Sequence, residues 1–133
     1  MPYTFDFDHA NRILRSRLSG RVTDAVLKDF FRIGSEHAAR VQPSAGVVDL
    51  SEVTSFEVSA QTIEELAKLA PALSNWNPRR VVIASSPEIY GMMRMFEMQG
   101  EATRPDLHVV RTEREAWAIL AVHKPRFEPL NKA

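Results

Sequence analysis

A regular alternation of strand-like and helix-like segments is the strongest constraint on the fold of this chain. Strand patterns occupy residues 3–8, 12–20, 46–50, 79–85 and 107–111, and helix patterns occupy about 24–40, 60–73, 87–99 and 113–120. Two strands come first, and each of the other three lies between two helices. Such alternation predicts right-handed crossovers, and therefore a mainly parallel sheet covered by helices.

The first two strands are predicted to form a hairpin. Tyr3, Phe5 and Phe7 alternate with polar residues, and this period of two indicates a strand with one buried face. Arg15 and Arg17 share one face of the second strand, and we expect that face to meet water. The expected fold is an α/β domain of order ββαβαβαβα, with a mixed, mainly parallel five-stranded sheet covered by four helices.

Capping residues mark the helix starts. Thr23 and Ser86 each precede a helix pattern, and Pro87 follows at a first helical position, where proline is favoured. Thr112 and Glu115 form a capping box. The second helix carries an apolar stripe that we expect to face the core: Ile63, Leu66, Ala67, Leu69, Ala70 and Leu73.

Length and composition limit the class of protein. A chain of 133 residues is expected to form one domain, which we place at 1–122. Residues 123–133 hold two prolines and are expected to be a tail or a packed extension rather than a helix. Its 17 basic and 17 acidic residues cancel, which argues against a nucleic-acid binder. The absence of cysteine excludes disulfides and fits a cytoplasmic setting. The sequence has no secretion signal, and no apolar run approaches the roughly 20 residues that a membrane span needs, so we expect a soluble protein.

The order of elements, together with the stretch VVDLSEVTSFEVSAQ, resembles the STAS domains, whose simplest members are the SpoIIAA-type antagonists of anti-sigma factors. In that family an apolar strand reads approximately DLSGV, and a DSSG motif follows whose second serine accepts phosphate. The first motif is matched at 49–53. At the second motif Ser59 stands at the acceptor position, but the three other positions differ: Glu57, Val58 and Ala60.

A later stretch, SPEIYGMMRMFEMQG, resembles a segment of small bacterial SpoIIAA-like proteins, some of which are similar to the CRAL-TRIO lipid carriers. Together the two resemblances span Tyr3 to about Leu120. They imply a bacterial regulatory domain that binds other proteins, or a carrier of an apolar molecule.

Ser59 has three interpretations. A serine before an apolar periodic run is most often a helix cap, although Thr62 and Glu65 form a rival capping box three residues later. A phosphate on Ser59 would be favoured by the helix dipole and opposed by Glu57. A nucleophile needs a base within reach, and no GxSxG elbow surrounds Ser59. The cap is the favoured interpretation, and the phosphorylation switch is the alternative.

Other reactive chemistry is not indicated. His9 lies in a turn, His37 on the apolar arc of the first helix, His108 in a strand and His123 in the tail, so neither a catalytic triad nor a metal pair is expected. The glycines stand alone and form no phosphate-binding loop. We therefore expect no enzyme activity and no cofactor.

The third helix carries more apolar surface than a helix beside a sheet needs. Its apolar side chains spread around most of the helix circumference. The surplus, rich in methionine, could pack beneath the tail around Phe127 and Leu130, meet a protein partner or a second copy of the chain, or line an apolar pocket. The residues proposed for partner or ligand contact are Glu57, Thr62, Tyr90, Met92, Met95, Phe96 and Met98.

The sequence hypothesis is therefore a non-enzymatic, cytoplasmic regulatory domain that binds a protein partner, possesses a phosphorylation candidate at Ser59, and is a candidate homodimer. The alternative is a small carrier that holds an apolar or lipid-like molecule between helices.

Overall fold

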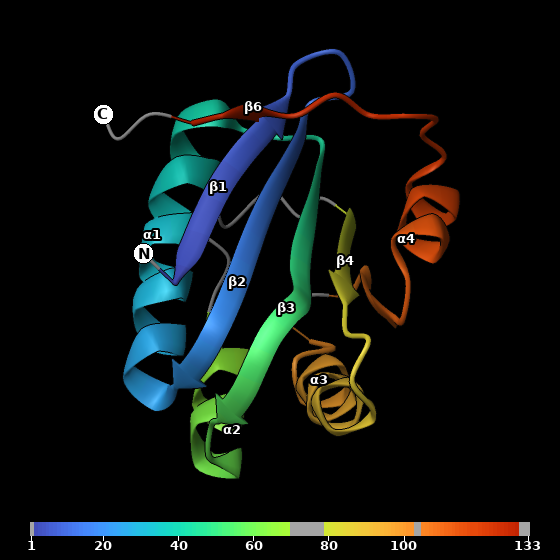
Figure 1. Ribbon diagram of the computed structural model, residues 1–133. Coiled ribbons are helices and arrows are strands. Elements are labelled where there is room, and N and C mark those ends of the chain that lie inside the picture. The colour runs from blue at the N-terminus through green and yellow to red at the C-terminus, as the bar shows by residue number, and fades with distance from the viewer. Residues whose placement is uncertain (1, 70–78, 103–104, 131–133) are drawn as a thin grey trace.

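The computed structural model describes residues 2–69, 79–102 and 105–130, which form an α/β protein with a mixed six-stranded sheet and, within those ranges, four helices (Figure 1). The elements follow the order β1 Tyr3–Asp8, β2 Ile13–Thr23, α1 Asp24–Val41, β3 Ala45–Glu57, α2 Ala60–Ala67, β4 Arg79–Ile83, α3 Pro87–Gln99, β5 Leu107–Val110, α4 Glu113–Leu120 and β6 Glu128–Pro129.

The strands lie in the order β5-β4-β3-β2-β1-β6. The hairpin β1–β2 is antiparallel, while β2, β3, β4 and β5 pair in parallel. The expected α/β class and mixed sheet are confirmed.

The expected number of five strands is wrong, because the tail adds β6 to the outer edge of β1. Glu128 and Pro129 pair antiparallel with β1, and the Leu130 N–H donates to the Phe5 carbonyl over 2.9 Å. A proline is tolerated there because an edge strand does not need every N–H for pairing.

Two layers of side chains fill the space on either side of the sheet. Helices α1, α2 and α3 share the larger apolar cluster, which includes Phe30, Ile63 and Met93. Helix α4 covers the other face through a smaller cluster with β3, β4 and β5. In Figure 1, α1 lies behind β1 and β2, while α4 lies beside β4, and no helix covers the near face of β1 and β2.

The strands β2 and β3 are longer than their neighbours. Strand β3 pairs with β2 as far as Glu57 but with β4 only from Ala45 to Asp49. Two register shifts in the β2–β3 pairing leave extra residues on β3, and such bulges increase the local twist. The second half of β3 is thus carried away from β4 toward the start of α2.

Helix α2 is shorter than the apolar stripe predicts. It ends at Ala67, and the Leu69 N–H donates to the Leu66 carbonyl in a tight final turn. Leu69, expected in the core, is 51% exposed, while Ile63, Leu66 and Ala67 are buried as expected. Residues 70–73 of the expected helix, including Ala70 and Leu73, lie outside the described residues.

Candidate functional site

Ser59 is the N-cap of α2, as favoured from the sequence. Its hydroxyl oxygen accepts from the Thr62 N–H over 3.1 Å and so satisfies one of the free N–H groups at the helix start. The rival cap at Thr62 is wrong, because Thr62 lies inside α2 with its side chain buried.

A carboxylate from α1 holds the same serine. The Ser59 N–H donates to Asp24 Oδ1 over 2.8 Å, and its hydroxyl lies 3.2 Å from Asp24 Oδ2. This N–H, together with the Ser59 and Thr62 hydroxyls, lowers the pKa of the Asp24 carboxyl. The first residue of α1 and the cap of α2 are therefore joined by an ionised carboxylate, which would lie beside any phosphate placed on Ser59.

Glu57 of β3 is held by an exposed ion pair with β2. Arg21 of β2 reaches both of its oxygens, with nitrogen–oxygen distances of 2.7 and 2.9 Å, and the Ser55 hydroxyl donates over 2.8 Å. Arg21, and then Ser55, lower the pKa of Glu57 to about 2. Glu57 is thus a charged, ordered side chain two residues before the α2 cap.

The side chains of α3 divide between core and surface. Ile89, Met93 and Phe96 are buried, which places Phe96 in the core rather than on a partner surface. Tyr90, Met92 and Met95 are half-buried against the larger cluster, and the Arg111 guanidinium lies 4.5 Å from the Tyr90 ring centre. Met98 is 63% exposed.

The tail does not cover α3 over the part that the structure describes. Phe127 packs on the opposite side of the sheet, 5.8 Å from the Trp117 ring of α4 between centroids. Leu130 continues the pairing with β1 beside Phe5 and packs against the larger cluster at the β1 edge of the sheet, opposite the β5 edge on which α3 packs. The interpretation that the tail shields the methionines of α3 is therefore wrong for residues up to 130.

Two exposed apolar side chains lie at one end of the α2–α3 pair. The C-terminal ends of these helices lie close together: a Cβ added at Gly100 would stand 3.3 Å from the Ala67 carbonyl oxygen. Leu69 follows Ala67 by two residues, and Met98 precedes Gly100 by two. They are the large apolar residues recorded as exposed in the described ranges.

An apolar cavity of about 170 Å³ lies between the helices and the sheet. Its lining includes Phe30 and Phe31 of α1, Leu50 of β3, and Met93 and Phe96 of α3. Engineered apolar cavities of about 150 Å³ stay dry and accept benzene. The cavity suits an aromatic ring or a short alkyl chain.

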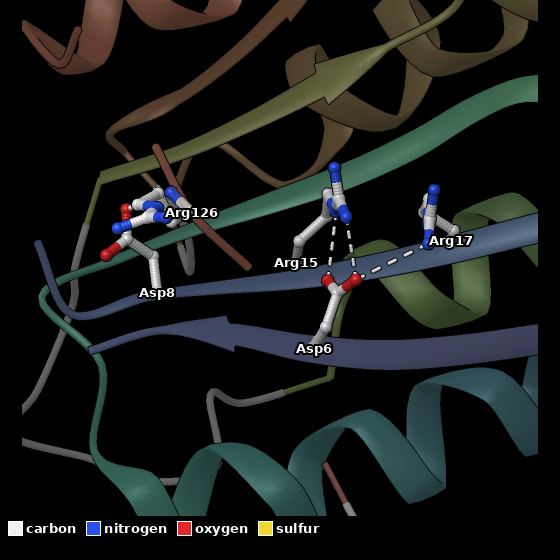
Figure 2. Close-up of polar contacts among 5 residues, drawn as sticks. All are labelled: Asp6, Asp8, Arg15, Arg17 and Arg126. Atoms are coloured by element: carbon white, nitrogen blue, oxygen red, sulfur yellow. Dashed lines mark hydrogen bonds and ion pairs between the residues drawn. The ribbon is translucent and has the colours of Figure 1, made fainter. Parts of the chain in front are cut away.

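A polar cluster that the sequence analysis did not predict joins β1 and β2 (Figure 2). Asp6 of β1 is buried and accepts from Arg15 through both oxygens, over 2.9 and 2.7 Å, and from Arg17 over 3.4 Å. The Arg15 Cζ lies 4.0 Å from the centre of the Phe127 ring. Arg15 therefore does not face water as expected: its side chain is only 16% exposed, against 37% for Arg17.

Asp8 joins the first turn to the tail, and Figure 2 places it near Arg126. Its oxygens accept from the Ala10 and Asn11 N–H groups, from the Asn11 amide, and from the Arg126 N–H over 3.2 Å. Burial would raise the pKa of Asp8, but these hydrogen bonds outweigh burial and lower it. An aspartate at a hairpin turn predicts hydrogen bonds to the neighbouring N–H groups, but the sequence does not predict the contact of Asp8 with the tail.

Ser59, His37 and His108 each contact charged side chains in the described ranges. The hydrogen-bond partners of Ser59 are Asp24 and Thr62 rather than a histidine. His37 contacts Arg40, and His108 contacts Asp106. Among residues 2–69, 79–102 and 105–130, no three histidine, aspartate or glutamate side chains gather closely enough to hold a metal ion. Across these same residues, each helix is too short or too polar to cross a membrane.

Comparison with protein-family models and with curated proteins gives no match for this chain.

Proposed function

We propose that this protein is a non-enzymatic interaction domain, with the joined ends of α2 and α3 as its contact surface. The supporting observation is the exposure of Leu69 and Met98, at 51% and 63%, where the two helices meet. Large apolar side chains that remain exposed together mark interaction sites more often than isolated ones do. The half-buried Met95 on the same helix extends this apolar surface.

Methionine suits such a role because its unbranched side chain adapts to irregular partners. The cap at Ser59 lies at the opposite end of α2, where Asp24 binds Ser59 and Glu57 is paired with Arg21. A regulatory phosphate on Ser59 remains part of the proposal, and it would act by displacing the Asp24 carboxylate. Such a modification would loosen the connection between α1 and α2.

Site-directed photocrosslinking in the source cell tests this proposal. A photoreactive side chain replaces Met98, and the matched control carries it at Arg32, an exposed position on α1. We expect a discrete protein adduct from position 98 that is absent from position 32. An adduct pattern that is the same at both positions, or no adduct at 98, contradicts the proposed surface.

The second candidate function, a carrier of a small apolar molecule, is supported by the cavity between α1, α3 and the sheet. Its volume of about 170 Å³ limits the ligand to a single ring or a short chain. Replacing Ala38, which lines the cavity, by leucine should fill it. If the carrier function holds, benzene should raise the melting temperature of the wild-type protein and should raise that of Ala38→Leu less, because the filled cavity binds it more weakly. An equal rise in the two proteins contradicts it.

A further inference from the structure

The second half of β3 is a strand edge that no described segment occupies. Strand β4 leaves β3 after Asp49, while β2 continues beside β3 to Glu57. No backbone hydrogen bond joins residues 52–57 to any described segment other than β2. This edge therefore presents free N–H and C=O groups, which can pair with an added strand.

The chain around the edge is ordered by its side chains. Val53 and Phe56 pack against the larger apolar cluster, which fixes the strand to the body of the protein. Glu57 is held by Arg21, and Asp49 accepts from the Ser51 N–H and hydroxyl at the point where β4 departs. An incoming strand would meet a preformed edge, so little ordering of β3 would oppose binding.

The charges on the edge select the occupant. Glu52 is exposed and has no partner among the described residues, and Glu57 lies near the other end. If two copies paired antiparallel along 52–57, Glu52 of each copy would face the Glu57 carboxylate of the other, whose cation Arg21 is already bound in its own ion pair, so Glu52 would gain no opposite charge. A basic strand would instead place lysine or arginine against Glu52.

We propose that residues 52–57 of β3 bind an extended, basic segment of a partner protein by strand addition. The segment alternates apolar and basic side chains, because neighbouring side chains of a strand point to opposite faces of the sheet. Main-chain hydrogen bonds provide the affinity, and Glu52 favours basic residues. This inference rests on the proposed interaction function only in needing a protein partner, since the edge and the apolar ends of α2 and α3 are different surfaces.

Nuclear magnetic resonance on the isotope-labelled full chain tests the proposal, with a short synthetic peptide of alternating lysine and valine as the probe. We expect chemical-shift changes and slowed amide exchange within 52–57. The matched probe has the same sequence with every backbone amide methylated, which removes the main-chain donors from both of its edges and keeps the charge, and it should not bind. Shifts confined to other residues, or equal binding of the two peptides, overturn the proposal.

The charge requirement is tested with two variants. Glu52→Lys should weaken peptide binding about two- to fivefold, the range expected for one cross-strand charge pair. Glu101→Lys, at an exposed turn, changes the net charge equally and should leave binding unchanged. Equal weakening by both variants overturns the specific role of Glu52. Met98→Glu should not alter peptide binding, so failure of the α2–α3 surface is distinguishable from failure of the β3 edge.

Discussion

At the scale of single residues, Ser59 combines a predictable role with an unpredictable one. Its cap of α2 follows from local sequence, because a hydroxyl before an apolar periodic run satisfies free N–H groups of the first turn. Its bond to Asp24 spans 35 residues of sequence, and no local pattern reports which side chains fold next to it. The same limit applies to Arg15, whose contact with Phe127 turned an expected exposed side chain into a covered one.

The residue-scale prediction concerns the charge beside Ser59. Ser59→Ala should lower the free energy of unfolding by about 1 kcal/mol, because the cap is lost. Ser59→Asn keeps a cap without charge and should cost less. Ser59→Asp also caps, but its carboxylate would lie against Asp24, so we expect it to be less stable than Ser59→Asn. Urea denaturation at neutral pH measures these differences.

The matched control for this charge effect is Asp24→Asn. Adding it should remove most of the difference between Ser59→Asp and Ser59→Asn, because the opposing charge is gone. A difference that persists in the Asp24→Asn background would show that repulsion by Asp24 is not the cause. It would also remove the reason to expect a phosphate on Ser59 to loosen the α1–α2 connection.

At the scale of elements, periodicity predicts helix faces well and helix ends less well. His37 lies on the apolar arc expected for α1 and is buried against Phe5, with ring centroids 4.7 Å apart. Helix α2 keeps its expected buried face but stops before the end of its apolar stripe, so Leu69 is exposed. A stripe indicates which side can be buried, whereas the end of a helix depends on the packing of its last turn.

The element-scale prediction is a pH dependence carried by α1. Burial, and then the charge of Arg40, lower the pKa of His37 below its usual 6.5. The unfolded chain therefore binds a proton more readily than the folded one at this residue, and the stability due to neutral His37 is complete above pH 6.5. It is lost as the pH falls from 6.5 toward the folded pKa.

Urea denaturation at a series of pH values checks this dependence. The free energy of unfolding of the wild type should fall on going from pH 7 to pH 5, and in His37→Gln this part of the fall should be absent. The comparison uses the slope with pH, because the substitution also removes the contact with Phe5 and lowers stability at every pH. Parallel slopes for the two proteins would rule out His37 as the source.

At the scale of the whole molecule, the α/β class and the mixed sheet could be predicted from the sequence, whereas the addition of β6 to the edge of β1 could not. Alternating strand and helix patterns predict a mainly parallel sheet covered by helices. The tail carries no strand pattern. Its strand β6 is held by the packing of Phe127 against Trp117 and Arg15, and by the hydrogen bond from the Arg126 N–H to Asp8. These contacts join the last described residues to the first strand, so only the folded chain reveals them.

The whole-molecule prediction follows from this dependence of β6 on one aromatic side chain. Because Phe127 is half-buried, Phe127→Ala should lower the free energy of unfolding by about 1–3 kcal/mol, less than the roughly 3–5 kcal/mol of a fully buried phenylalanine. The Leu130 amide, bonded to the Phe5 carbonyl, should then exchange with solvent faster, while amides of β3 and β4 keep their protection.

The control variant, Glu128→Gln, changes an exposed side chain of β6 and should leave the stability and the Leu130 exchange rate unaltered. Hydrogen exchange read by nuclear magnetic resonance separates the outcomes: slow exchange at Leu130 in Phe127→Ala would mean that main-chain pairing holds β6 without the aromatic contact.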